Sequence, residues 1–182
     1  MTGTDENESV QSQSTSDVAP NSTVAADENL RSAPTSAGME LSATMLVDGI
    51  ASGQVCATRD MISFWGGYDP STGTVIDRRH PLSGECLTGK IFVLPHGKGS
   101  STGSAVLLDS IVLENAPAAI ILNRVDEIIA LGSVVAEEFF KRTIPVAVLP
   151  DKDFAVALEA DRIDITIDGS VTAFGHEGAT IR

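Results

Sequence analysis

The chain has 182 residues, of which 25 are Asp or Glu and 12 are Lys or Arg, so its formal charge at neutral pH is −13. This charge argues against nucleic acid or an anionic membrane as a partner, because binding either would need a basic face. The longest apolar stretch, Ala116 to Leu122, is too short to cross a bilayer, and the acidic N-terminus lacks the basic and apolar regions of a signal peptide. We therefore expect a cytoplasmic protein.

The N-terminal segment differs in composition from the rest of the chain. Residues 1–38 are rich in Ser, Thr, Asn, Asp and Glu, contain no aromatic residue and show no apolar period of helix length. Such a segment cannot bury enough apolar surface to offset the entropy of folding. We expect a disordered acidic tail over residues 1–38, followed by one compact domain over residues 39–182.

Two cysteines, Cys56 and Cys86, are widely separated in the sequence. Their spacing fits neither a disulfide framework nor a zinc-ligand pattern. We expect both thiols to be buried, as free cysteines commonly are.

Short apolar runs separated by turn residues begin at Leu41 and predict a small β layer. Strands are expected over residues 44–47 and 54–57, beside turns at Asp48-Gly49 and Ser52-Gly53. A loop with aromatic anchors follows over residues 63–73 and contains Trp65, the only Trp of the chain. Residues 77–85 form a basic stretch that includes His80, and composition alone predicts a solvated loop there.

From Lys90 onward, the pattern alternates between strand and helix. Strands are expected over residues 90–94, 118–122 and 144–148, with helices over residues 104–115 and 133–141. This βαβαβ order predicts parallel strands with right-handed crossovers.

The second of these helices places Val134, Val135, Glu138 and Phe139 on one side and pairs Glu137 with Lys141 on the other. A short helix near residues 154–158, a strand over 163–167, a turn at Asp168-Gly169 and a strand over 171–174 complete the domain. The predicted class is α/β, with the βαβαβ unit and the β layer sharing one core.

The glycine-rich segment of residues 97–104 lies between a predicted strand and a predicted helix. Its sequence is Gly97-Lys98-Gly99-Ser100-Ser101-Thr102-Gly103-Ser104. At a helix N-terminus, unpaired N–H groups and the macrodipole favour an anion or a developing alkoxide. The segment does not match the nucleotide P-loop, because Phe92 and Gly99 hold the places of required residues, and it matches the dinucleotide fingerprint only weakly.

Two functional classes remain open from the residues alone. The spacing of Gly99, Ser101 and Gly103 satisfies the nucleophile elbow of serine hydrolases, for which His176 is the only downstream histidine. A non-catalytic anion-binding module is the other class.

A set of motifs in order and spacing resembles the small subunit of the aconitase X family. The motifs are Ser63-Phe64-Trp65-Gly66-Gly67, Asp69-Pro70, Gly73, His80-Pro81-Leu82, Gly84, Gly97-Lys98-Gly99-Ser100 and Ala116-Pro117-Ala118-Ala119. The resemblance implies a swivelling β/β/α domain that closes over the active site of a large partner subunit, forming a heterodimer. It also implies that the enzyme eliminates water from a small hydroxylated carboxylate. Its iron or iron–sulfur centre would be held by cysteines of the large subunit, with no metal on this chain.

The resemblance assigns Ser100 as the proton acceptor. Lys98 stands where the family has Arg, so an ammonium replaces a guanidinium that could donate two parallel hydrogen bonds to a carboxylate. Positive potential from Lys98 and the helix N-terminus would favour the alkoxide of Ser100. The expected supporting or substrate-binding residues are Gly97, Lys98, Gly99, Ser101, Thr102, Trp65 and His80.

Within the family, the expected substrate is cis-3-hydroxy-L-proline, and mevalonate 5-phosphate is the alternative. The Trp65 loop and residues 79–82 resemble the hydroxyproline branch more closely. A phosphate-bearing substrate would favour several cations at the site, and the chain has 12 basic residues in all.

Overall fold

The computed structural model of the protein describes residues 38–175. The tail expected over residues 1–38, apart from Gly38, lies outside the described residues, as does His176. The boundary between tail and domain therefore stays a prediction.

The described chain contains short strands and four helices in the following order. The elements are β1 (Met39–Leu41), β2 (Thr44–Val47), β3 (Ala51–Ala57), α1 (Phe64–Gly67), β4 (Tyr68–Asp69), β5 (Thr74–Val75), β6 (Ile91–Leu94), α2 (Thr102–Val112), β7 (Ala119–Leu122), α3 (Glu127–Phe140), β8 (Val146–Val148), α4 (Asp151–Leu158), β9 (Arg162–Ile165) and β10 (Val171–Phe174). Among these residues, no helix is long and apolar enough to span a membrane.

Eight strands form one curled sheet in the order β1-β10-β9-β3-β6-β7-β8-β2, and β4 and β5 form a separate pair. Strands β3, β6, β7 and β8 are parallel to one another. The remaining strands of the large sheet add to its two ends in antiparallel pairs. The expected βαβαβ unit is confirmed as β6-α2-β7-α3-β8.

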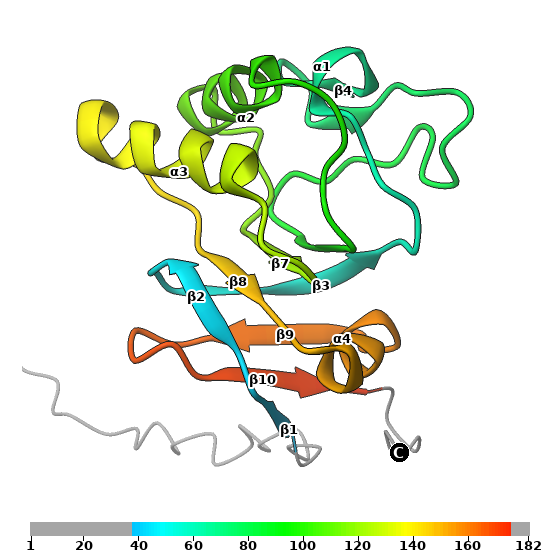
Figure 1. Ribbon diagram of the computed structural model, residues 1–182, viewed down its shortest axis with the longest axis vertical. Helices are drawn as coiled ribbons and strands as arrows, with labels where there is room; N and C mark the ends of the chain where they lie inside the picture. The colour runs from blue at the N-terminus through cyan, green and yellow to red at the C-terminus, as the bar shows by residue number, and fades with distance from the viewer. Residues whose placement is uncertain (1–37, 176–182) are drawn as a thin grey trace, which may run out of the picture. The chain divides into compact units, whose positions relative to one another are not determined.

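Figure 1 shows these elements in three layers, with α2 and α3 above the parallel strands and β9, β10 and β1 below them. Because side chains alternate along a strand, each parallel strand contributes to both interfaces. Phe92 and Leu94 of β6 join the cluster under α2 and α3, whereas Ile91 and Val93 join the cluster shared with α4 and β9. The prediction of one shared core is therefore wrong, since the central sheet separates two cores.

Helix α3 begins at Glu127, six residues before the expected start, because Asp126 caps it. The Asp126 carboxylate accepts hydrogen bonds from the backbone N–H groups of Ile128 and Ile129. The earlier start changes the buried face, which consists of Ile129, Gly132, Ser133 and Ala136.

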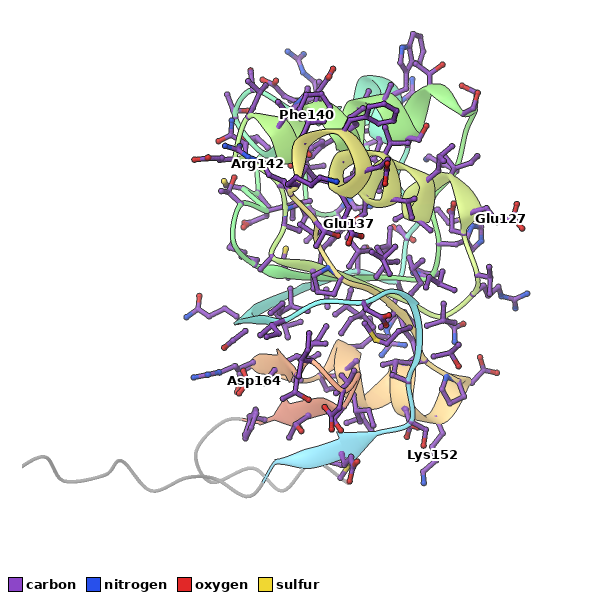
Figure 2. All side chains as sticks on the ribbon, turned by 90° about the vertical axis from the view of Figure 1, so that its left-hand side faces the viewer. Glu127, Glu137, Phe140, Arg142, Lys152 and Asp164 are labelled. Carbon is purple, nitrogen blue, oxygen red and sulfur yellow. The ribbon has the colours of Figure 1, made fainter. Side chains whose placement is uncertain are left out.

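The apolar side predicted for α3 faces solvent instead. Val134 is 47% exposed and Phe139 is 75% exposed. The predicted pairing of Glu137 with Lys141 is also wrong, because Lys141 ends the helix in the left-handed conformation and its ammonium donates to the carbonyl of Glu138. Figure 2 shows Glu127 and Arg142 near opposite ends of this helix.

Three further predictions need correction. Ser52 and Gly53 lie within β3 and not in a turn, because they pair in register with Asp164 and Ile163 of β9. Strand β9 ends at Ile165, and helix α4 begins at Asp151. The other bounds agree with prediction to within a few residues.

The loop of residues 63–73 folds into α1 and the first half of the β4–β5 pair, and its anchors are Phe64 and Tyr68. Their rings pack edge to face with centroids 5.5 Å apart, and both side chains are buried. Trp65 is 64% exposed. Of the two cysteines, Cys56 is buried as expected, but Cys86, which forms an isolated antiparallel bridge with Thr74, is exposed.

Candidate functional site

The glycine-rich segment connects β6 to α2 and places Ser100 just before the helix. Ser101 is the N-cap residue, although its side chain makes no capping hydrogen bond. The first turn is closed by backbone bonds from Gly103 N–H to the Ser100 carbonyl (2.9 Å) and from Ser104 N–H to the Ser101 carbonyl (3.1 Å). Ser100 is exposed, and its hydroxyl donates to Thr102 Oγ1 at 3.2 Å.

Asp126 fixes this segment from one side. One carboxylate oxygen accepts the backbone N–H of Gly97 at 2.8 Å, while the other caps α3. A Cβ at position 97 would lie 2.9 Å from that carboxylate oxygen and 3.2 Å from Ile129 Cδ1, so the close approach requires glycine. The N-terminus of α3 is thereby tied to the loop that carries Ser100.

The segment before α1 holds the loop from the other side. Lys98 N–H donates to the Ile62 carbonyl at 2.9 Å, and Ile62 forms a parallel bridge with Gly97. Gly99 has φ of +117°, a conformation that side chains disfavour, and a Cβ there would lie 3.1 Å from Ser63 Oγ. The backbone that leads to Ser100 is thus held at Gly97 by Asp126 and at Lys98 by the Ile62 carbonyl.

Ser100 lies at a small pocket of about 30 Å³, which we call the serine pocket. It is lined by Phe64, Gly97, Lys98, Gly99, Ser100, Gly103, Asp126, Ile128 and Ile129. Within the described residues, the Lys98 ammonium has no hydrogen bond or ion pair, so its charge is not neutralised inside the protein. A cation and a helix N-terminus therefore both lie at the pocket that holds Ser100, and positive potential favours the ionised form of a hydroxyl.

A second, larger hollow of about 370 Å³ adjoins the same lysine, and we call it the charged hollow. It is lined by Asp60, Met61, Asp77, Arg79, His80 and Lys98. His80 is buried, in contrast to the solvated loop predicted for its segment. Lys98 is thus shared by both cavities.

The structure brings some of the expected site residues together and separates others. Gly97, Lys98, Gly99 and Ser100 line the serine pocket. His80 lines the charged hollow, whereas Ser101, Thr102 and Trp65 line neither cavity. Sequence reasoning missed Asp126, although an Asp followed by Glu127 and two isoleucines is a helix-start signal.

The described residues do not fit a metal centre. Over residues 38–175, no group of three or more His, Cys, Asp and Glu side chains could hold a metal ion.

The fold and the site together define a class of protein. It is a three-layer β/β/α domain with a serine and a lysine at a helix N-terminus. The family model described as Aconitase X swivel domain matches residues 40–173, and the chain belongs to that family. The resemblance and the fold class expected from the sequence are both confirmed.

Relatives and solved structures agree with this assignment. Cis-3-hydroxy-L-proline dehydratase of Pseudomonas aeruginosa is 52% identical over 107 residues, which are 59% of this chain and 18% of the relative. The phosphomevalonate dehydratase small subunit of Methanothermobacter thermautotrophicus is 38% identical over 130 residues, which are 71% of this chain and 94% of the relative. The crystal structure of Thermococcus kodakaraensis aconitase X matches with a TM-score of 0.65 and 31% identity, covering 76% of this chain and 100% of that chain.

The lengths of these matches differ between the two kinds of relative. The chain spans about a fifth of the cis-3-hydroxy-L-proline dehydratases that it matches, 18% of one and 20% of another. It spans nearly the whole of the Methanothermobacter small subunit.

Proposed function

We propose that this chain is the small subunit of a two-chain hydro-lyase of the aconitase X type. Support comes from the match to nearly the full length of a protein named as a dehydratase small subunit. The family and the hydro-lyase names of both kinds of relative favour elimination of water from a hydroxylated carboxylate.

Ser100 is the proposed general base. The observation that carries this role is the pairing of Ser100 with the unneutralised Lys98 in one pocket at the N-terminus of α2. The Ser100 oxygen removes the proton α to the substrate carboxylate, and the electron pair of that C–H bond forms a C=C bond. The bond to the β-hydroxyl breaks and hydroxide leaves. Release of the abstracted proton from Ser100 restores the base, so the net loss from the substrate is one water molecule.

The proposed substrate is cis-3-hydroxy-L-proline. Elimination from it gives an enamine that rearranges to a cyclic imino acid. The identities of 52% and 50% to two dehydratases of this amino acid favour the choice. Mevalonate 5-phosphate is the second candidate, because the small subunit covered over 94% of its length is named for that reaction.

The partner is a large subunit that holds the iron or iron–sulfur centre, as the family resemblance implies. Two exposed apolar side chains support a surface that a partner could cover. Met61, which lines the charged hollow, is 40% exposed, and Trp65, next in sequence to the pocket residue Phe64, is 64% exposed. Closure of this domain over the partner would bury them and exclude water from the pocket.

The experiment is to combine this chain with its large subunit, load the complex with iron and offer both compounds. Imine formation from cis-3-hydroxy-L-proline, with no reaction of mevalonate 5-phosphate, is the expected result. Reaction of the phosphate compound alone would overturn the substrate and leave the hydro-lyase class in place. Labelling of Ser101 by a fluorophosphonate would instead favour a serine hydrolase.

A further inference from the structure

The charged hollow is built from three segments, each of which is held by backbone hydrogen bonds. Lys98 N–H donates to the Ile62 carbonyl, next to Met61, at 2.9 Å. In the basic loop, Asp77 N–H donates to the Gly67 carbonyl at 3.3 Å and His80 N–H donates to the Asp77 carbonyl at 3.1 Å. The walls of the hollow are therefore held by backbone hydrogen bonds and not only by side chains.

Charges of both signs line the hollow, and most are not neutralised by the protein. Within residues 38–175, no ion pair or side-chain hydrogen bond engages the Arg79 guanidinium, the Lys98 ammonium or the Asp60 carboxylate. Asp77 accepts the backbone N–H of Arg79 at 3.0 Å through one oxygen, so its other oxygen is available. Two cations and two carboxylates match a ligand that itself carries both charges.

His80 also lines the hollow and carries a buried hydrogen-bond donor that has no partner among the described residues. Its side chain is 6% exposed, and its Nδ1 accepts the backbone N–H of Leu82 at 3.2 Å. The ring proton therefore resides on Nε2. This buried atom has no hydrogen-bond partner among the described residues, an arrangement that proteins avoid unless a ligand or water completes it.

We infer that the charged hollow binds the zwitterionic head group of the substrate. The carboxylate lies with Arg79, Lys98 and the His80 Nε2–H, and the ammonium lies with Asp60 and Asp77. This inference rests on the proposed function and deepens it, because it assigns the substrate class to an α-amino acid. Mevalonate 5-phosphate has no ammonium and would leave the two carboxylates of the hollow without a partner, which disfavours it.

Lys98 explains how this head group would be positioned for reaction. The same lysine lines the serine pocket and the charged hollow. A carboxylate bound to it is therefore held next to Ser100, and the carbon that carries the α-proton is attached directly to that carboxylate. Binding and proton abstraction are coupled through one cation.

The test uses the iron-loaded complex and three competitive inhibitors. L-Proline carries both charges, tetrahydrofuran-2-carboxylate lacks the ammonium, and pyrrolidine lacks the carboxylate. We expect L-proline to bind at least about tenfold more tightly than either of the others, since a charge-assisted hydrogen bond is lost in each.

Two variants test which residues of the hollow bind the carboxylate and which bind the ammonium of the head group. Arg79→Met should raise the KM for cis-3-hydroxy-L-proline by about tenfold and reduce the preference for L-proline over pyrrolidine, because Lys98 and His80 remain. Asp60→Asn should reduce the preference over tetrahydrofuran-2-carboxylate, because Asp77 remains. Arg78→Met is the matched control, because Arg78 is exposed and does not line the hollow, and its KM should be unchanged.

The outcomes separate this inference from the proposed function. An unchanged KM in Arg79→Met and Asp60→Asn, with Ser100→Ala still inactive, would overturn the head-group site and leave the proposed function standing. If the wild-type complex turned over neither compound, the proposed function would fail. Calorimetric titration with L-proline would then decide on the hollow alone, because binding lost in Arg79→Met supports it and absent binding to the wild type overturns it.

Discussion

At the residue scale, we expect Lys98 to support activity through its positive charge and not through the shape of its side chain. It lines both cavities and has no ion-pair partner in the described part of the chain. Lys98→Arg keeps the charge and should retain most of the activity of the complex. Lys98→Met removes it and should lower kcat/KM by at least about tenfold, because the alkoxide of Ser100 and the bound carboxylate both lose a cation. Equal activity of Lys98→Met and wild type would contradict this role.

The two thiols should also differ in reactivity. Hydrogen bonding with Thr88 lowers the pKa of the exposed Cys86 thiol, whereas burial raises the pKa of Cys56. At neutral pH the thiolate fraction is therefore larger at Cys86, and we expect iodoacetamide to modify Cys86 and spare Cys56 in the folded chain. Peptide mass mapping measures both, with Cys86→Ser as the control. Modification of both thiols at similar rates would be the contrary result.

At the element scale, Asp126 couples the start of α3 to the loop that carries Ser100. Asp126→Ala removes the cap and the bond to Gly97 together, so it should lower the free energy of unfolding by about 1–2 kcal/mol and also lower kcat. Asp126→Asn keeps one capping oxygen but loses the second acceptor. It should unfold in urea close to wild type and still have a reduced kcat, a separation that a purely structural role would not produce.

The elements that the sequence predicted well are those whose signal is local. Strands β6 and β7 are continuous buried apolar runs, and the Gly-rich segment between strand and helix is recognisable by composition. Helix α3 was predicted poorly because its buried face includes the small residues Gly132, Ser133 and Ala136, and α2 packs closely against it at Gly132. A hydrophobic pattern search instead selects Val134 and Phe139, which face solvent.

The charged hollow could not be predicted for a different reason. Asp60, Arg79 and Lys98 come from three segments that meet only in the folded domain. Nothing in the spacing of these residues predicts that they share a cavity. By contrast, the neighbours of Ser100 in the serine pocket include its own loop, which is why the pattern predicted part of that site.

At the scale of the whole molecule, the proposed function divides the reaction between two chains, with the base on this chain and the iron centre on the large subunit. We therefore expect the purified chain alone to bind no stoichiometric iron and to show no dehydratase activity. Activity should appear on mixing with the large subunit. Turnover by this chain alone, measured as imine formation, would contradict the two-chain architecture.

The central claim is that this chain provides the catalytic serine to the complex. The most direct measurement compares complexes formed with wild-type, Ser100→Ala and Ser101→Ala chains, using cis-3-hydroxy-L-proline as substrate and gel filtration to verify equal assembly. We predict that Ser100→Ala lowers kcat by about a hundredfold to ten-thousandfold, the range for loss of a general base, and that Ser101→Ala has a much smaller effect. A complex with Ser100→Ala that kept wild-type kcat would contradict the account.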